Sequence, residues 1–156
     1  MYKKHIVTWD MLQIYTKKLA SKIYSIKKWK GIIGVSRGGL IPATLLAREL
    51  SIRYVDTLCI CSYNDYYLQN IKVLKKPEYS TDDILIVDDL VDTGGTAKII
   101  RKMYPSTYFV TIFAKPKEKR LVDNYMIDIP QNIWVEQPWD MTLSYSKPLI
   151  KEPKIK

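Results

Sequence analysis

The run ILIV at residues 84–87 is the sequence feature that most constrains the fold. A strand that is apolar on both faces has to be covered on both faces, as in a parallel sheet flanked by helices. Four other runs with apolar or β-branched character indicate further strands, at 31–35, 54–63, 108–115 and 125–129. Helical patterns separate several of these strands, and this alternation predicts an α/β fold with a mostly parallel central sheet flanked by helices.

Three segments have the apolar spacing of helices that pack one face against a core. The first covers 8–24, and Thr8 or Asp10 can cap its N-terminus. The second covers 43–50, and the third follows a Gly-Gly pair. Residues 64–80 are polar and aromatic with weaker periodicity, and we interpret them as a long excursion that forms a lid with a hairpin arm.

The composition is that of an ordinary globular protein, with 47% hydrophobic and 26% charged residues. The net charge of +9 is compatible with a phosphorylated substrate, nucleic acid or a lipid surface. Because the positive residues are scattered, we favour biased composition as its explanation. The sequence has no apolar run near the roughly 18 to 20 residues of a membrane span and no signal-peptide core. Without repeats or a linker, we expect a single cytoplasmic domain over 1–156.

The few cysteine and histidine residues exclude several kinds of site. Cys59 and Cys61 are the only cysteines, and their spacing puts both on one face of a strand. Without further cysteine or nearby histidine they do not form a zinc site, so we expect buried free thiols. His5 is the only histidine, which excludes a triad or a metal cluster built on imidazole.

Directly after 84–87 the chain continues DDLVDTGGTA, with three carboxylates and a Gly-Gly pair. Ligands of parallel α/β sheets bind at the carboxyl ends of the strands, so Asp88 and Asp89 should lie at the ligand-binding edge. In an extended chain their side chains point opposite ways, which eases their repulsion. The glycines let backbone N–H groups approach an anion, and the N-terminus of the following helix favours negative charge. With the hydroxyl groups of Thr93 and Thr96, this loop predicts a phosphate site.

The segment VSRGGL at 35–40 predicts a second anion-binding loop. Arg37 can hold pyrophosphate oxygens through two parallel hydrogen bonds. Neither loop has the spacing of a P-loop or of a dinucleotide-binding glycine motif. Taken singly, the first loop has the alternative of an acid-rich helix cap, and the second that of a structural arginine beside glycines. The two together favour phosphate binding.

The combination of an apolar strand, Asp-Asp and Asp-Thr-Gly-Gly-Thr resembles the phosphoribosyl-pyrophosphate signature of type I phosphoribosyltransferases. The resemblance implies the fold of that family, with a small hood and a flexible loop. It implies Mg²⁺ as cofactor with Asp89 at the metal position, binding of the 5-phosphate by 93–96, and commonly a cis peptide at Ser36–Arg37. The residues implied to bind the donor are Ser36, Arg37, Gly38, Gly39, Asp88, Asp89, Leu90, Val91, Asp92, Thr93, Gly94, Gly95 and Thr96.

Two further residues bear on the acceptor. Lys115 ends the run 108–115 at the same edge of the sheet, and its ammonium group can donate to a purine O6. The indole of Trp134 can stack on a purine ring. Taken singly, each residue has an equally good alternative explanation: Lys115 as a solvated lysine and Trp134 as a core tryptophan. Together, after the phosphoribosyl signature, they predict a 6-oxopurine pocket.

The segments IVTWDMLQI, FVTIFAKP and EQPWDM resemble the 6-oxopurine branch of the family, in register over about 6–142, followed by a variable basic tail at 143–156. This implies Mg²⁺-dependent transfer to N9 of guanine, xanthine and, less well, hypoxanthine, with release of pyrophosphate. It also implies a homotetramer and, in some relatives, peripheral contact with the inner membrane face. The implied purine-binding residues are Asp92 as catalytic acid/base group near N7, Lys115 at O6, Trp134 stacked on the ring and the Val135 backbone at the 2-position.

Two positions depart from the family pattern. Gln69 stands in the mobile loop where relatives carry arginine, and Ser51 stands where glycine usually ends the preceding helix. If that position needs a left-handed backbone, serine costs roughly 1 kcal/mol. Two alternatives stay open. One is an enzyme for another acceptor, such as a hypoxanthine-preferring or an orotate enzyme, and the other is a regulatory nucleic-acid-binding protein of the same fold. Lys115 with Trp134 argues against orotate, and the lack of a helix-turn-helix extension or RNP-like motif argues against nucleic acid.

Overall fold

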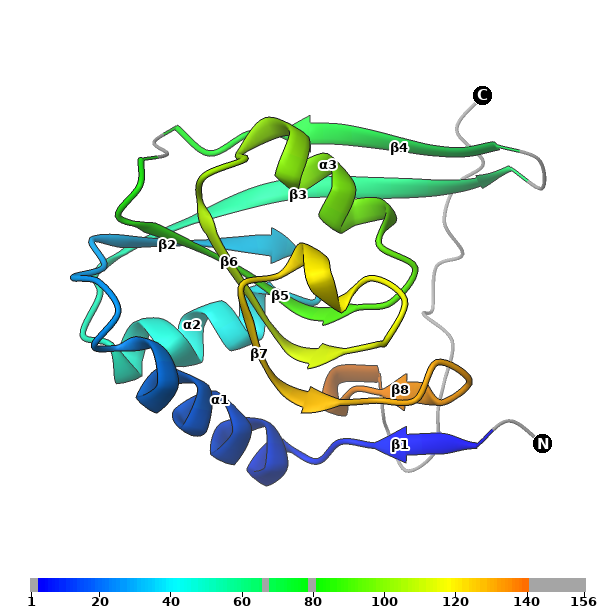
Figure 1. Cartoon of the computed structure of the whole chain (residues 1–156), viewed down its shortest axis with the longest axis horizontal. Coiled ribbons are helices and arrows are strands. Elements are labelled where there is room, and N and C mark those ends of the chain that lie inside the picture. Colours follow the sequence, from blue (N-terminus) through cyan, green and yellow to red (C-terminus); the bar gives the residue numbers. More distant parts are fainter. Residues whose placement is uncertain (1–2, 66–67, 79–80, 141–156) are drawn as a thin grey trace.

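The computed structural model describes residues 3–65, 68–78 and 81–140 (Figure 1). Its main element is a six-stranded sheet with the strand order β4-β3-β2-β5-β6-β7. All neighbouring strands in it are parallel except β3 and β4, which pair antiparallel. This confirms the predicted α/β fold with a mostly parallel sheet. The strands are β2 (Gly31–Ser36), β3 (Tyr54–Asp65), β4 (Leu68–Lys75), β5 (Ile84–Val91), β6 (Tyr108–Ala114) and β7 (Asn124–Asp128).

Helices cover both faces of this sheet, α1 (Trp9–Ile23) and α2 (Leu40–Glu49) on one face and α3 (Gly95–Met103) on the other (Figure 1). All three were predicted from apolar spacing. α1 begins after Thr8, whose hydroxyl oxygen accepts a hydrogen bond from the Met11 N–H at 3.2 Å. None of the helices that the structure describes is long and apolar enough to cross a membrane.

β5 contributes to both cores of the molecule. Leu85 and Val87 pack with residues of α1 and α2, whereas Ile84 and Ile86 pack with residues of α3. All four side chains are fully buried. The alternation of side chains along a strand explains how four consecutive apolar residues supply two separate cores.

A second sheet of two parallel strands lies beside the main one and corresponds to the expected hood (Figure 1). Its strands are β1 (Lys4–Ile6) and β8 (Trp134–Glu136). Two short 3-10 helices complete the fold, η1 (Lys119–Leu121) between β6 and β7 and η2 (Pro138–Asp140) after β8. Each hood strand has only three residues. Such short strands carry no alternation that a sequence can reveal, and neither was predicted.

β3 and β4 form the hairpin arm that was expected in the excursion at 64–80, and the arm extends beyond the rest of the sheet (Figure 1). Residues 66–67 and 79–80 lie outside the described residues, and so do the side chain of Gln69 and the basic tail at 143–156. Closure of the arm as a lid therefore stays a prediction.

The end of β5 differs from the expectation. The strand does not stop at residue 87 but continues to Val91, because its backbone keeps pairing with β6 until Val91 lies opposite Ala114. Asp88 and Asp89 consequently lie inside the strand, near its carboxyl end, rather than in the loop that follows.

The environment of the two cysteines also differs. Cys59 and Cys61 are free thiols, as expected, but both residues are half-buried rather than buried. Neighbouring β2 ends where Ser36 lies opposite Cys59, so β3 loses one of its two partners from this point onward. With one neighbouring strand missing, the thiols are only partly covered.

Ser51 occupies the left-handed backbone region that the sequence comparison with the family raised as a possibility. It directly follows the C-cap of α2 and has a φ of 54°. Its N–H donates to the Arg48 carbonyl at 3.2 Å, which closes the end of the helix. A residue with a Cβ is strained in this conformation, whereas glycine is not.

We therefore expect Ser51→Gly to raise the free energy of unfolding by about 0.5 to 1 kcal/mol, because relief of strain exceeds the added freedom of the unfolded chain. Chemical denaturation measures the change. Ser51→Ala is the matched control, since it removes the hydroxyl group and keeps the Cβ. Equal stabilisation by both substitutions would show that backbone strain is not the cause.

Asp56, near the start of β3, ties this strand to the end of the hairpin arm. The ammonium of Lys75 lies 2.6 Å from Asp56 Oδ1, and the N–H groups of Thr57 and Glu78 donate to the same carboxylate at 2.7 and 2.9 Å. Burial by itself would raise the pKa of Asp56. The hydrogen bonds from Lys75, Thr57 and Glu78 outweigh burial and lower the pKa to about 2.

A depressed pKa in the folded state means that Asp56 stabilises the fold above its ordinary pKa of 3.8 and loses this contribution as the pH falls to about 2. Asp56→Asn should thus lower the free energy of unfolding by roughly 1 kcal/mol near neutral pH, allowing for solvent screening of the pair. The difference from the wild type should shrink as the pH falls. Denaturation curves over a pH series, with exposed Asp82→Asn as control, measure it, and a pH-independent difference would contradict the assignment.

Candidate active site

The carboxyl ends of β2, β5 and β6 meet at one edge of the sheet, because the three strands are adjacent and parallel. The two predicted anion-binding loops lie at this edge, and the Ser36–Arg37 peptide bond at the start of the first loop is cis, as the resemblance implied. Both loops line a cavity of about 280 Å³. The predicted donor-binding residues that line it are Ser36, Gly38, Asp88, Asp89, Leu90, Val91, Asp92, Thr93, Gly94, Gly95 and Thr96.

Two predicted donor-binding residues are outside this lining. Gly39 is buried behind the cavity, and Arg37 is exposed. The position of Gly39 has a steric reason, because a Cβ there would lie only 2.4 Å from the Val87 carbonyl oxygen and 2.7 Å from the Val35 carbonyl oxygen. The loop therefore packs with its backbone directly against the backbones of β2 and β5.

The Gly-Gly turn leads straight into α3. Gly94 has a φ of 80°, in the left-handed region, and the nine-residue helix begins at Gly95. Its first-turn N–H groups and partial positive charge lie at the cavity, where Thr93 and Thr96 also contribute to the lining. A Cβ on Gly94 would lie 2.6 Å from Glu118 Cγ, so glycine is required here by space as well as by conformation.

Asp88 and Asp89 are half-buried neighbours on β5. The Asp89 N–H donates to Asp88 Oδ1, and Gln137 Nε2 donates to Asp89 Oδ2, both at 2.9 Å. Burial raises the pKa of Asp88 well above its ordinary value, and the Asp89 charge raises it further. Burial also raises the pKa of Asp89, against hydrogen bonds that lower it. The Asp89 charge still acts on Asp88, so part of the repulsion between the two carboxylates remains.

The acidic pair fits a Mg²⁺ ion, which binds one or two carboxylates and completes its shell with substrate oxygens and water. Both residues line the cavity. Gly38 has no side chain to cover the Asp89 carboxylate, because a Cβ there would lie 2.5 Å from Oδ1. Within the described ranges, no group of three or more His, Cys, Asp and Glu residues could hold a metal ion. The oxygens of a bound substrate would therefore have to complete the shell.

Asp92 follows β5, and two donors hold its carboxylate. Lys115 Nζ lies 2.8 Å from Oδ2, and Gln131 Nε2 lies 3.0 Å from Oδ1. The lysine side chain is only 5% exposed, whereas that of Asp92 is 37% exposed. Asp92 is thus an accessible carboxylate in a fixed orientation, which is what a group that exchanges a proton with a bound molecule needs.

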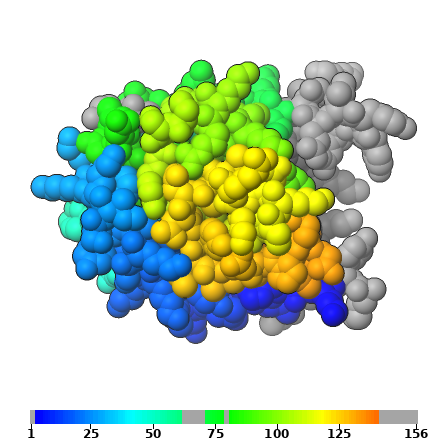
Figure 2. All heavy atoms as spheres, in the orientation of Figure 1, coloured from blue at the N-terminus to red at the C-terminus, as the bar shows by residue number. Residues whose placement is uncertain are grey.

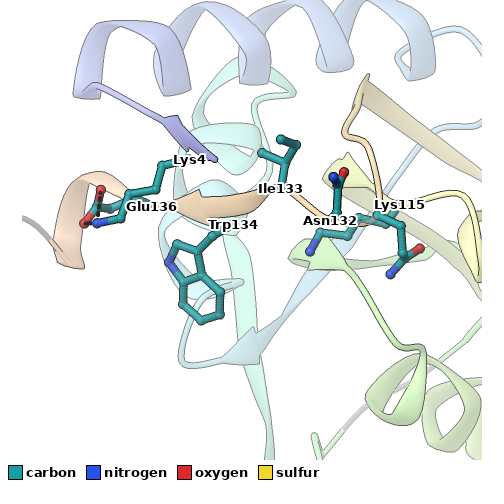
Figure 3. Close-up of a pocket in the computed structure, with 7 residues that line it drawn as sticks. Lys4, Lys115, Asn132, Ile133, Trp134 and Glu136 are labelled. Carbon is teal, nitrogen blue, oxygen red and sulfur yellow. Dashed lines mark hydrogen bonds and ion pairs between the residues drawn. The ribbon is translucent and has the colours of Figure 1, made fainter. Parts of the chain in front are cut away.

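A second, larger cavity of about 610 Å³ is lined by hood residues, by Lys115, which follows β6, and by the segment just before β8 with Gln131, Asn132 and Ile133. Around the Trp134 indole, Lys4 and Glu136 lie on one side and Lys115 and Asn132 on the other (Figure 3). Trp134 is 56% exposed and Lys115 is 4% exposed. The alternatives of a core tryptophan and a solvated lysine are therefore both wrong. The indole face is open to a flat ligand, as expected for a stacking residue.

The other hood residues support this cavity. Lys4 Nζ and Glu136 Oε1 lie 3.2 Å apart across the two strands, and the Glu136 side chain is only 5% exposed. Val135 lies opposite His5 in the hood sheet, with its side chain buried. The Val135 backbone directly follows Trp134, which lines the cavity. Its contact with a base stays a prediction.

Sequence analysis missed three residues of this site, Gln131, Gln137 and Glu118. Gln137, which is 3% exposed, donates a hydrogen bond to Asp89, and Gln131 donates one to Asp92. Glu118 packs against Gly94. Each partner lies more than twenty residues away in the chain, and no spacing rule reveals such a contact. The only available signal was the presence of both glutamines in the segments DIPQ and EQPWD around β8.

The close packing of Gly39 leads to a prediction. Gly39→Ala should lower the free energy of unfolding by about 1 to 3 kcal/mol, because the added methyl group meets the Val87 carbonyl oxygen and the backbone has to move. Denaturation curves measure the loss, with Thr44→Ala on the exposed side of α2 as a control that should stay close to the wild type. Unchanged stability of Gly39→Ala would show that the loop can accommodate a methyl group, which would contradict the close packing.

Comparison with known proteins agrees with this geometry. A family model described as the phosphoribosyl transferase domain matches residues 6–146. The structure is similar to the purine phosphoribosyltransferase of Pyrococcus horikoshii, with a TM-score of 0.76 at 25% identity over 96% of this chain and 99% of that chain. It is also similar to the Helicobacter pylori xanthine-guanine-hypoxanthine phosphoribosyltransferase, with a TM-score of 0.75 at 22% identity over 90% of this chain and 96% of that chain. The hypoxanthine phosphoribosyltransferase of Trypanosoma cruzi in complex with the product IMP has a TM-score of 0.66 at 23% identity, over 83% and 81%. The chain belongs to the phosphoribosyl transferase family.

Proposed function

We propose that the chain is a xanthine-guanine phosphoribosyltransferase of purine salvage, of the enterobacterial type that its sequence segments resemble. It transfers the phosphoribosyl group of 5-phosphoribosyl 1-pyrophosphate to N9 of guanine, xanthine and, less well, hypoxanthine, and releases pyrophosphate. The observation that carries the proposal is the junction of the two cavities. Asp92 lines the smaller, polar one, Lys115 lines the larger one, and their charged groups lie 2.8 Å apart.

The donor occupies the smaller cavity in this proposal. The N–H groups and hydroxyls of 93–96 bind its 5-phosphate, and the loop at 36–39 with Arg37 binds its pyrophosphate. Asp88 and Asp89 lie beside the ribose hydroxyls. Asp89 would hold Mg²⁺ together with donor oxygens, and the ion would supply positive charge beside the acidic pair and the leaving group.

The base occupies the larger cavity. Trp134 stacks on the purine ring, the Lys115 ammonium donates to O6, and the Val135 backbone contacts the 2-position. Asp92 accepts the N7 proton as N9 forms its bond to C1 of the ribose and the bond from C1 to pyrophosphate breaks. The protein mainly orients both reactants and stabilises charge, since little covalent chemistry falls to it.

Assembly and location complete the proposal. We infer a homotetramer and a cytoplasmic enzyme with peripheral contact to the inner membrane face, on the strength of the resemblance and of a net charge of +9 that is compatible with anionic lipid. The single catalytic domain covers 1–156 and its core about 6–142.

The direct test is nucleotide formation from each of four bases by the purified protein with Mg²⁺ and 5-phosphoribosyl 1-pyrophosphate. We expect turnover of guanine, xanthine and hypoxanthine and none of adenine, whose 6-amino group cannot accept a hydrogen bond from Lys115. Turnover of adenine would contradict the O6 pocket. No turnover of any base, with the donor still bound, would favour the regulatory nucleic-acid-binding alternative, which salt-dependent retention of labelled RNA then tests.

Removal of the Lys115 ammonium tests the base pocket. Lys115→Ala should raise the KM of all 6-oxopurines by roughly 5- to 160-fold, because a charged hydrogen bond of about 1 to 3 kcal/mol is lost. Steady-state kinetics with guanine and xanthine measure the effect. Lys102→Ala removes an exposed lysine of α3 and should leave both KM values unchanged. An unchanged KM for guanine in Lys115→Ala would remove this residue from the pocket.

A further inference from the structure

We propose that Gln131 is a positioning residue for Asp92, whose carboxylate it holds in the orientation that takes the purine proton. The inference rests on the proposed function, in which Asp92 is the acid/base group, and adds a residue that the function alone does not assign. Gln131 lies in the connection between β7 and β8, outside the phosphate loop and three residues before Trp134.

The side-chain amide of Gln131 joins two groups whose chemistry fixes its orientation. Its Oε1 accepts a hydrogen bond from the Lys117 backbone N–H at 3.2 Å, and its Nε2 donates to Asp92 Oδ1 at 3.0 Å. A backbone N–H can only donate and an ionised carboxylate can only accept. With the amide turned around, both contacts would be lost, so the NH₂ group has to face Asp92.

Gln131 and Lys115 together hold both oxygens of the Asp92 carboxylate. Lys115, which follows β6, donates a hydrogen bond from Nζ to Oδ2. Gln131, in the connection before β8, donates one from Nε2 to Oδ1. A carboxylate held at one oxygen still rotates easily, because the terminal torsion of aspartate is broad. Held at both oxygens from separate segments, it keeps one plane. Each oxygen retains a lone pair for a bound base.

Lys115 has a second task during the reaction. In the proposed function its ammonium also donates to purine O6, so Lys115 has to serve Asp92 and the base together. Gln131 donates to the other oxygen of the Asp92 carboxylate and takes its own orientation from the backbone N–H of Lys117. Gln131 therefore holds Asp92 through a contact that has no part in binding O6.

The test compares kinetics of Gln131→Leu and Gln131→Glu with the wild type. Gln131→Leu removes the amide, and Gln131→Glu keeps the shape and the acceptor for Lys117 but loses the donor to Asp92. Each should lower kcat about tenfold, the effect of one charge-assisted hydrogen bond, with KM for guanine and for the donor changed less than about threefold. Gln13→Leu and Gln13→Glu make the same replacements at an exposed position of α1 and should match the wild type.

A double-mutant cycle separates positioning from a general structural role. If Gln131 acts through Asp92, Gln131→Leu should lower kcat in the wild-type background and have no effect on the residual kcat of Asp92→Asn. An equal fold-loss in both backgrounds, or a wild-type kcat in Gln131→Leu and Gln131→Glu, would overturn the inference.

Chemical denaturation of the same four proteins tests the contact independently of activity. The midpoint denaturant concentration should fall more in Gln131→Leu with Asp92 present than when Asp92 is already asparagine, because the contact with Lys117 is lost in both backgrounds. If the wild type turns over no purine, the proposed function fails, and this second cycle still decides whether Gln131 holds Asp92. Additive midpoints would then overturn the contact as well.

Discussion

The burial of β5 on both faces determines where the other parts of the molecule lie. Its four apolar residues need α1 and α2 on one side and α3 on the other, and α2 and α3 each lie in the chain between two parallel strands of the sheet. Parallel strands end at the same edge, so residues from β2, β5 and β6 meet there although they lie far apart in the sequence. The position of Gly39 follows from this arrangement, because its loop passes close to the backbone carbonyl groups of Val87 and Val35.

The same edge gathers negative charge, and the structure manages each carboxylate in a different way. Asp92 has two donors from the protein, Lys115 and Gln131. Asp89 accepts a hydrogen bond from the side-chain amide of the buried Gln137, and Asp88 accepts one from the backbone N–H of Asp89. Burial raises the pKa of both Asp88 and Asp89, and the Asp89 charge raises the pKa of Asp88 further. A divalent cation would supply positive charge to this pair, whereas Asp92 already has the ammonium of Lys115 beside it.

The sequence was sufficient for the features that depend on local pattern. Apolar spacing identified the three helices and the long strands, and turn chemistry identified the two loops that line the smaller cavity. The three-residue strands of the hood could not be predicted, because they are held by each other across more than a hundred residues. The end of β5 was placed too early, since its last residues pair through their backbones and carry polar side chains. Gln131 and Gln137 were missed for a related reason: their roles exist only once the hood has folded against the strand ends.

The account as a whole depends on Asp92 exchanging a proton with the base while other groups bind the donor. The most direct measurement is turnover of guanine by Asp92→Asn beside calorimetric titration of the same variant with 5-phosphoribosyl 1-pyrophosphate and Mg²⁺. We expect a kcat about 100-fold or more below the wild type, the usual size of an acid/base contribution. The donor affinity should stay close to that of the wild type. Near-normal turnover, or a loss of donor binding as large as the loss of turnover, would contradict this role of Asp92.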